Sequence, residues 1–235
     1  MRAAGDPRIH ARRDRRRFLA QSSAAILFGL STAAETRRAV RLFLCGDVMT
    51  GRGIDQVMRH PGDPRLHEPF VESAKEYVAI AEQASGPIPR QVDPAYVWGD
   101  TLNELDRARP EAGIVNLETA VTTANEPWAG KGIHYRMHPS NVGCLTAAKI
   151  DCCTLANNHV LDWGHDGLTE TIATLHASGI RTAGAGADET EARAPAVIAL
   201  PGGDGCGGSS WYQPAFVGSA SIARPPETPH GCRKR

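Results

Sequence analysis

The chain has 235 residues, enough for one sizeable hydrophobic core or for one domain and a fragment. Its content of 41% hydrophobic and 22% charged residues is ordinary for a globular protein. The 26 basic and 26 acidic residues balance, but residues 1–38 hold nine arginines and three acidic residues, which leaves 17 basic and 23 acidic residues in the remainder. This mildly acidic body argues against a nucleic-acid-binding protein, which presents a basic face.

The amino-terminal segment has the order of an export signal. Residues 14–20 (Asp-Arg-Arg-Arg-Phe-Leu-Ala) are close to a twin-arginine motif, and a short apolar stretch at 24–30 and a run of small residues follow. The apolar stretch is too short to span a bilayer, which takes roughly 20 residues. We therefore predict a signal peptide at 1–38 and an exported protein of the periplasm or cell envelope. The alternative is a basic tail with a chance apolar run. Lysine at Arg15 and Arg16 is expected to retain the protein in the cytoplasm.

Apolar runs and helical spacing alternate along the chain after the predicted signal peptide. Strands are predicted at 40–45, 113–117, 152–155 and 196–200. Helices are predicted at about 54–58, 68–84, 101–107, 141–149 and 167–178, with Asn141 as an N-cap. A long polar connection covers 122–140. This alternation predicts an α/β core with a mostly parallel sheet and right-handed crossovers.

Polar side chains follow three of the predicted strands at the point where each strand ends. Asp47 follows the first strand, Glu118 the second, and the Asn157-Asn158-His159 run the third. In α/β sheets, ligands bind at the carboxyl ends of the strands. Carboxylate, amide and imidazole donors suit a hard or borderline divalent metal, so a metal-centred site is predicted. The alternatives are a turn acid, a surface carboxylate and a helix cap, respectively.

The same segments resemble a known family. The blocks are residues 46–52 (Gly-Asp-Val-Met-Thr-Gly-Arg), 116–118 (Asn-Leu-Glu), 157–164 (Asn-Asn-His-Val-Leu-Asp-Trp-Gly) and 179–186 (Gly-Ile-Arg-Thr-Ala-Gly-Ala-Gly). In this order they resemble CapA-type capsule (poly-γ-glutamate) synthesis proteins, a branch of the calcineurin-like metallophosphoesterase superfamily. The resemblance covers about residues 40–200. It implies a layered α/β/β/α sandwich, present here in incomplete form.

The resemblance also assigns roles at the predicted site. It implies Asp47, Glu118 and Asn158 as metal ligands and His159 as the acid or transition-state stabiliser. We expect Asp162 to orient the His159 imidazole, because carboxylates behind a functional histidine commonly do so. The implied cofactors are divalent metal ions, with Mn, Mg, Fe and Zn as candidates.

Other residues are weaker candidates. Arg52 is a candidate for neutralising an anionic substrate, against an ordinary solvated arginine. Further candidates for lining the site, each with a surface or packing alternative, are His134, Tyr135, Arg136, His138, Trp163 and His165. The six cysteines, at 45, 144, 152, 153, 206 and 232, are interpreted as packing residues and not as ligands.

The sequence departs from the superfamily pattern in two ways. Met49 stands where metallophosphoesterases place a histidine, as it does in CapA-type proteins. The superfamily also completes its site with histidines from the second half of the fold, and His230 is the sole histidine after residue 176. We therefore predict a CapA-like domain at 39–201, an irregular tail at 202–235 caused by a frameshift or truncation, and a sheet left with an unpaired edge or face.

The leading functional prediction is an exported CapA-like protein of capsule or poly-γ-glutamate synthesis that acts as a metal-dependent hydrolase. The alternatives are a non-enzymatic assembly or export subunit and an inactive fragment. The predicted partners are an anionic polymer or a phosphoester-like substrate and a membrane-bound polymer synthesis complex, with no nucleic acid. Substrate, metal identity and the presence of catalysis stay open at this point.

Overall fold

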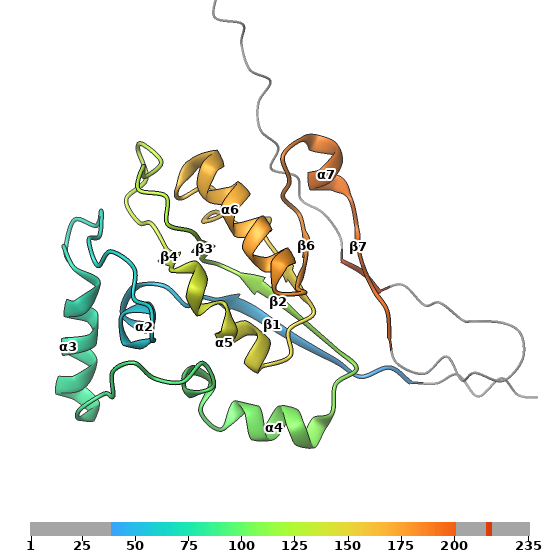
Figure 1. The fold of residues 1–235 in the computed structure, drawn as a ribbon, viewed down its shortest axis with the longest axis horizontal. Coiled ribbons are helices and arrows are strands. Elements are labelled where there is room, and N and C mark those ends of the chain that lie inside the picture. The colour runs from blue at the N-terminus through green and yellow to red at the C-terminus, as the bar shows by residue number, and fades with distance from the viewer. Residues whose placement is uncertain (1–38, 201–214, 218–235) are drawn as a thin grey trace, which may run out of the picture. The chain divides into compact units, whose positions relative to one another are not determined.

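The computed structural model describes residues 39–200 and 215–217 (Figure 1). The predicted signal peptide at 1–38 and all but three residues of the predicted tail at 202–235 therefore lie outside the described residues. Within the described part, none of the helices combines the length and the apolar character that crossing a membrane requires.

A parallel sheet forms the centre of the fold. Its strand order is β1-β2-β5-β6, and each neighbouring pair is parallel. The strands are β1 (Leu42–Val48), β2 (Ala112–Leu117), β5 (Cys152–Thr154) and β6 (Arg181–Ala183). The predicted α/β class and its parallel sheet are confirmed.

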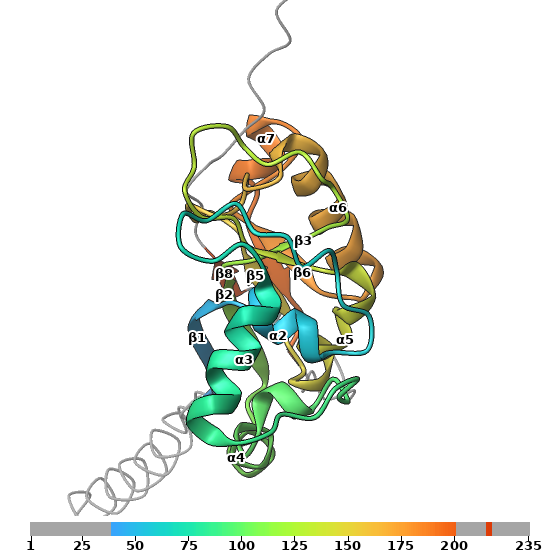
Figure 2. The same cartoon turned by 90° about the vertical axis from the view of Figure 1, so that its left-hand side faces the viewer.

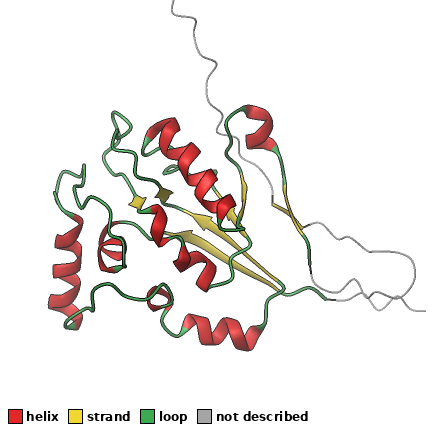
Figure 3. Cartoon of the chain, viewed as in Figure 1, coloured by secondary structure: helices red, strands yellow, loops and turns green. Residues whose placement is uncertain are grey.

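Helices supply the crossovers between these strands (Figure 3). They are α2 (Arg52–Val57), α3 (Ala74–Ser85), α4 (Thr101–Ala108), α5 (Gly143–Ala147) and α6 (Gly164–Ala177), with 3-10 turns η1 (Tyr96–Trp98) and η2 (Pro139–Asn141). A further helix, α7 (Glu189–Arg193), follows β6. Figure 2 shows α5 and α6 on one side of the strands. Leu145 from α5 and Leu175 from α6 pack there in the main core with Val115 of β2. Burial of such side chains is the main stabilising contribution, at about 1.5–3 kcal/mol each.

Two short strand pairs complete the described structure. Strands β3 (Ala120–Val121) and β4 (Arg136–Met137) pair in parallel, and β7 (Ala196–Ile198) pairs antiparallel with β8 (Ala215–Val217). Ala196 and Ile198 of β7 pack with Cys152 on the second face of the sheet. The composition of the tail did not predict β8.

Strand β1 is an edge of the sheet within the described residues. Leu42 and Leu44 pair in register with Ala112 and Ile114, and the two leucines are 41% and 67% exposed. An edge strand with exposed apolar side chains favours association. The sequence-based expectation of an unpaired edge or face, which followed from a missing second half, stays a prediction.

The structure corrects the start of one predicted helix and the predicted role of Asn141 as an N-cap. The helix predicted from residue 68 begins at Ala74, because Ser73 caps it and forms a capping box with Glu76. Asn141 does not cap α5. Its buried amide instead donates to Asp55 Oδ1 and to the carbonyl of His60, at 2.8 and 2.9 Å. Because a buried amide needs hydrogen-bond partners, and Asn141 finds them in Asp55 and His60, its side chain does not cap the helix.

The described cysteines behave as packing residues. Cys45, Cys144, Cys152 and Cys153 carry free thiols, and all but Cys45 are buried. Burial raises the pKa of Cys144 to about 12 and that of Cys152 to about 11. Such thiols stay protonated and unreactive at neutral pH. Residues 206 and 232 lie outside the described residues.

Candidate functional site

The carboxyl ends of β1, β2 and the turn after β5 meet through a chain of amide hydrogen bonds. Asn116 Nδ2 of β2 donates to Asp47 Oδ1 of β1 at 2.8 Å. Asn157 Nδ2, from the turn after β5, donates to Asn116 Oδ1 at 3.0 Å and to the carbonyl of Leu117 at 2.9 Å. The predicted convergence of the three strand ends is therefore present, and Asn116 is the link between them.

The turn after β5 is held by Asn157. Its Oδ1 accepts from the backbone N–H of His159 at 2.9 Å, which closes an Asx turn. Asn158 contributes its backbone carbonyl, which accepts a hydrogen bond from Lys131 Nζ. The hydrogen bonds of Asn157 and Lys131 therefore hold the backbone of the turn at Asn158 and His159.

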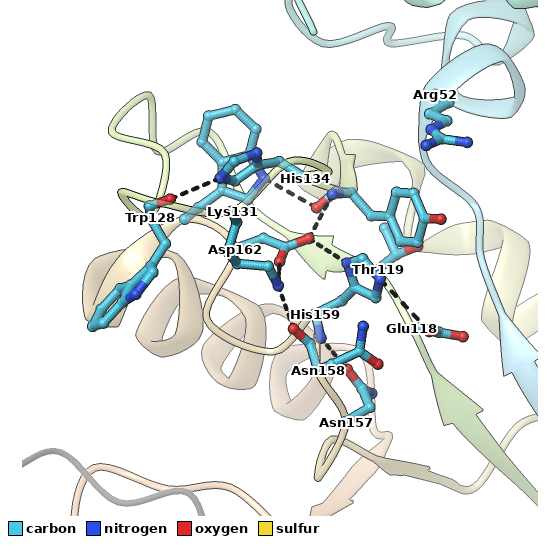
Figure 4. A network of polar contacts seen from close by, with 12 residues as sticks. Arg52, Glu118, Thr119, Trp128, Lys131, His134, Asn157, Asn158, His159 and Asp162 are labelled. Atoms are coloured by element: carbon cyan, nitrogen blue, oxygen red, sulfur yellow. Dashed lines mark hydrogen bonds and ion pairs between the residues drawn. The ribbon is translucent and has the colours of Figure 1, made fainter. Parts of the chain in front are cut away.

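His159 and Asp162 form a buried pair at the centre of the site (Figure 4). His159 Nδ1 lies 2.7 Å from Asp162 Oδ2, and the Asp162 side chain is 0% exposed. His159 Nε2 lies 3.7 Å from Glu118 Oε1. The sequence-based prediction that Asp162 contacts the imidazole agrees with this geometry. A proton on Nδ1, directed at Asp162, leaves Nε2 as the nitrogen that faces Glu118 and any bound molecule.

The connection between β3 and β4 supplies the other partners of Asp162. The Tyr135 N–H donates to Asp162 Oδ2 at 2.6 Å, and Lys131 Nζ forms an ion pair with Asp162 Oδ1. The Trp128 N–H donates to the backbone carbonyl of Asp162 at 2.8 Å. A buried carboxylate that binds a cation and N–H donors is held in one orientation.

The sequence named Tyr135 as a weak candidate and missed Lys131. A lysine between Gly130 and Gly132 is typical of a solvated loop, so no local pattern marks it as a partner of a buried carboxylate. Only the fold of the connection over residues 157–162 brings the ammonium group to Asp162.

Two of the remaining weak candidates, Arg52 and Trp163, make contacts inside the protein. Arg52 Nε binds Glu68 Oε1 at 2.7 Å, so its charge is balanced inside the protein. Trp163 is buried, its Nε1 donates to the carbonyl of Tyr135 at 3.0 Å, and the Arg136 guanidinium lies 3.9 Å from its ring centroid. The contacts of Trp163 hold the end of the connection between β3 and β4 in place.

The other candidate histidines make their contacts in or near the connection between β3 and β4. His134 is buried, with Nε2 3.0 Å from the Trp128 carbonyl. His138 Nδ1 accepts from the Ser140 N–H at 3.1 Å, and the His165 ring lies 5.9 Å from that of Trp128, centroid to centroid. None of these contacts joins His134, His138 or His165 to Glu118 or His159.

The metal prediction meets an incomplete donor set. Across residues 39–200 and 215–217, no group of three or more His, Cys, Asp or Glu side chains is arranged to hold a metal ion. Asp47 accepts from Asn116, and Glu118 faces His159. The described residues therefore do not fit the two-metal centre that the superfamily implies, and metal ligation by Asp47, Glu118 and Asn158 stays a prediction.

The fold and the strand-end site define an α/β protein with a polar site at the carboxyl ends of a parallel sheet. The chain belongs to the family of the bacterial capsule synthesis protein PGA_cap, whose profile matches residues 41–209. Two curated relatives from Mycobacterium tuberculosis, strains CDC 1551 / Oshkosh and ATCC 25618 / H37Rv, are each described as a probable polyglutamine synthesis accessory protein. Each is 45% identical over 161 residues, which cover 68% of this chain and 42% of the relative. The chain thus spans less than half the length of these relatives, and the recognition of a CapA-type capsule protein is confirmed.

Proposed function

We propose that this chain carries part of the polymer-handling site of an exported accessory protein of polyglutamate or capsule synthesis. In this proposal, His159 transfers a proton during hydrolysis or transfer of the polymer. The ligand is an anionic polymer of the polyglutamate type. The family and the names of the relatives support an anionic polymer as the ligand. The contacts of His159 support its role in proton transfer.

The observation that carries this proposal is the buried pair of His159 and Asp162 at the carboxyl edge of the sheet. Asp162 is fixed by Lys131 and by the Tyr135 N–H, so it holds the imidazole in one tautomer. In this tautomer Nε2 carries no proton, so it is placed to take a proton from the attacking water or nucleophile and then to give that proton to the leaving group of the polymer. Glu118, 3.7 Å from Nε2, is placed to orient that water.

A second candidate is a subunit that binds the polymer without chemical change and presents it to a membrane-bound synthesis complex. The incomplete metal donor set among the described residues favours this candidate. Release of free glutamate from poly-γ-glutamate separates the two, because an assembly subunit binds the polymer and releases none.

Polymer binding tests the proposal directly. Poly-γ-glutamate is expected to bind the wild-type chain, and His159→Gln should weaken the binding about tenfold or more, the effect of losing one hydrogen bond to a charged group. The matched control is His176→Gln, on α6, where Nε2 contacts the Thr182 hydroxyl away from the strand ends. Isothermal titration calorimetry gives both affinities. Equal binding by wild type and His159→Gln would refute the proposed site.

Metal titration tests the cofactor prediction. We expect weak binding of Mn²⁺ or Zn²⁺, because the described residues bring together few of the donors that such ions need. Calorimetric titration of the chain and of the Glu118→Gln variant measures this. Tight binding by the wild type that Glu118→Gln abolishes would show that the donor set is complete after all.

A further inference from the structure

A flat side chain covers one face of the His159 imidazole. The Tyr135 ring lies on it with centroids 3.9 Å apart and planes 22° from parallel. The Arg52 guanidinium carbon lies 4.7 Å from the same tyrosine ring centroid and 4.8 Å from that of Tyr77. Since a stacked imidazole fills one face of the Tyr135 ring, the guanidinium occupies the other. We call Tyr77, Arg52, Tyr135 and His159 the stack.

The outer end of the stack is fastened by Glu68. Its Oε1 accepts from Arg52 Nε at 2.7 Å, and its Oε2 accepts from the Tyr77 hydroxyl at 2.7 Å. The Glu68 side chain is 4% exposed, and its hydrogen bond raises the pKa of Tyr77. A carboxylate that binds both neighbouring layers fixes their spacing, and a planar guanidinium is well suited to stacking between two rings.

Arg52 reaches this position at a conformational cost. Its φ is +49°, in the left-handed region that residues other than glycine rarely adopt. Such strain is of order 1–3 kcal/mol and persists where the surroundings over-determine the conformation. The ion pair with Glu68 and the two ring contacts are those surroundings. The first residue of α2 therefore adopts a conformation that delivers the Arg52 side chain to Tyr135.

At the other end of the stack, Tyr135 and Asp162 together set the orientation of the His159 imidazole. The hydrogen bond from Nδ1 to Asp162 fixes one point of the ring but leaves it free to tilt about that contact. The Tyr135 ring removes this freedom, because a tilt would break the stacked contact. Tyr135 also fixes Asp162 through its backbone N–H, so one residue holds both members of the pair.

We propose that Tyr135 and Arg52 are positioning residues for His159, acting through the stack so that Nε2 faces Glu118. The assignment rests on the proposed function for the role of His159 in proton transfer. The orientation of the ring is a separate observable, which can be measured without any polymer. Tyr135 contributes its aromatic face and not its hydroxyl, and Arg52 holds that face in place.

NMR of the histidine ring protons in the full chain, assigned by comparison with His159→Gln, tests the proposal. A proton above an aromatic face is shifted upfield, so we expect upfield His159 resonances in the wild type. Tyr135→Phe should preserve this shift, Tyr135→Leu should abolish it, and Arg52→Gln should reduce it. The control is Tyr96→Leu, an exposed tyrosine outside the stack, which should leave it unchanged.

An unchanged His159 shift in a folded Tyr135→Leu variant would overturn the positioning role. If that variant does not fold, an unchanged shift in Arg52→Gln overturns it instead. The same spectra recorded with poly-γ-glutamate separate this inference from the proposed function. Variant-dependent shifts without any response to the polymer would support the stack and refute the polymer site.

Discussion

Replacing Asp162 with alanine is expected to destabilise the folded chain by about 3–5 kcal/mol, the usual cost of removing one partner of a buried ion pair. Asp162 is fully buried and binds His159 Nδ1, the Tyr135 N–H and Lys131 Nζ. Alanine removes the acceptor of His159 Nδ1 and of the Tyr135 N–H, and it removes the charged partner of Lys131. Urea unfolding followed by circular dichroism measures the change in the free energy of unfolding.

Two further variants make this result specific. Asp162→Asn keeps the shape and one acceptor oxygen, so its cost should be smaller than that of alanine. Asp106→Ala removes an exposed carboxylate that pairs with the exposed Lys149, and it should change stability by about 1 kcal/mol or less. Equal stability of Asp162→Ala and the Asp106→Ala control would show that the network around Asp162 does not hold the site together.

Replacing Asp55 with alanine should have the next largest effect, about 3 kcal/mol, because three buried or half-buried donors then lose their acceptor. Asp55 of α2 is buried. It accepts from the Gly62 N–H at 2.7 Å, the His138 N–H at 2.9 Å and Asn141 Nδ2 at 2.8 Å. It therefore ties together segments that lie far apart in the chain. Hydrogen exchange should show faster exchange at Gly62 and His138 than in the wild type, and unchanged exchange there would contradict this role.

The elements that could be predicted are those with a local signal. The apolar runs of β1, β2 and β5 predicted strands, and the polar residue after each run predicted a shared edge of the sheet. Strand β6 was missed because its sequence, Arg-Thr-Ala, has no apolar run, and pairing with β5 alone makes it a strand. Short strands of this kind depend on tertiary partners more than on propensity.

In the candidate site too, the residues of one local motif could be predicted, and those that only the fold brings together could not. His159 and Asp162 lie three residues apart in one motif, so their contact was predictable from the sequence. Lys131 and Tyr135 come from a connection without periodicity, and their distance from Asp162 is set by how the connection folds over the turn. Asp55 was missed for the same reason: an acid in a short helix resembles a surface residue until its partners from other segments are known.

The site as a whole depends on a few fixed points in the turn after β5. Asn157 holds the turn to β2, and Asp162 holds the imidazole of His159. These contacts place Nε2 at the carboxyl edge of the sheet, beside Glu118. The proposed function requires that a polymer segment reach this nitrogen.

A crystal structure of the chain with a short γ-linked glutamate oligomer tests that claim most directly. We expect the oligomer at the carboxyl edge of the sheet, with one of its polar atoms within about 3.2 Å of His159 Nε2, the range of a hydrogen bond. An oligomer bound elsewhere, with Nε2 still facing only Glu118, would contradict the account.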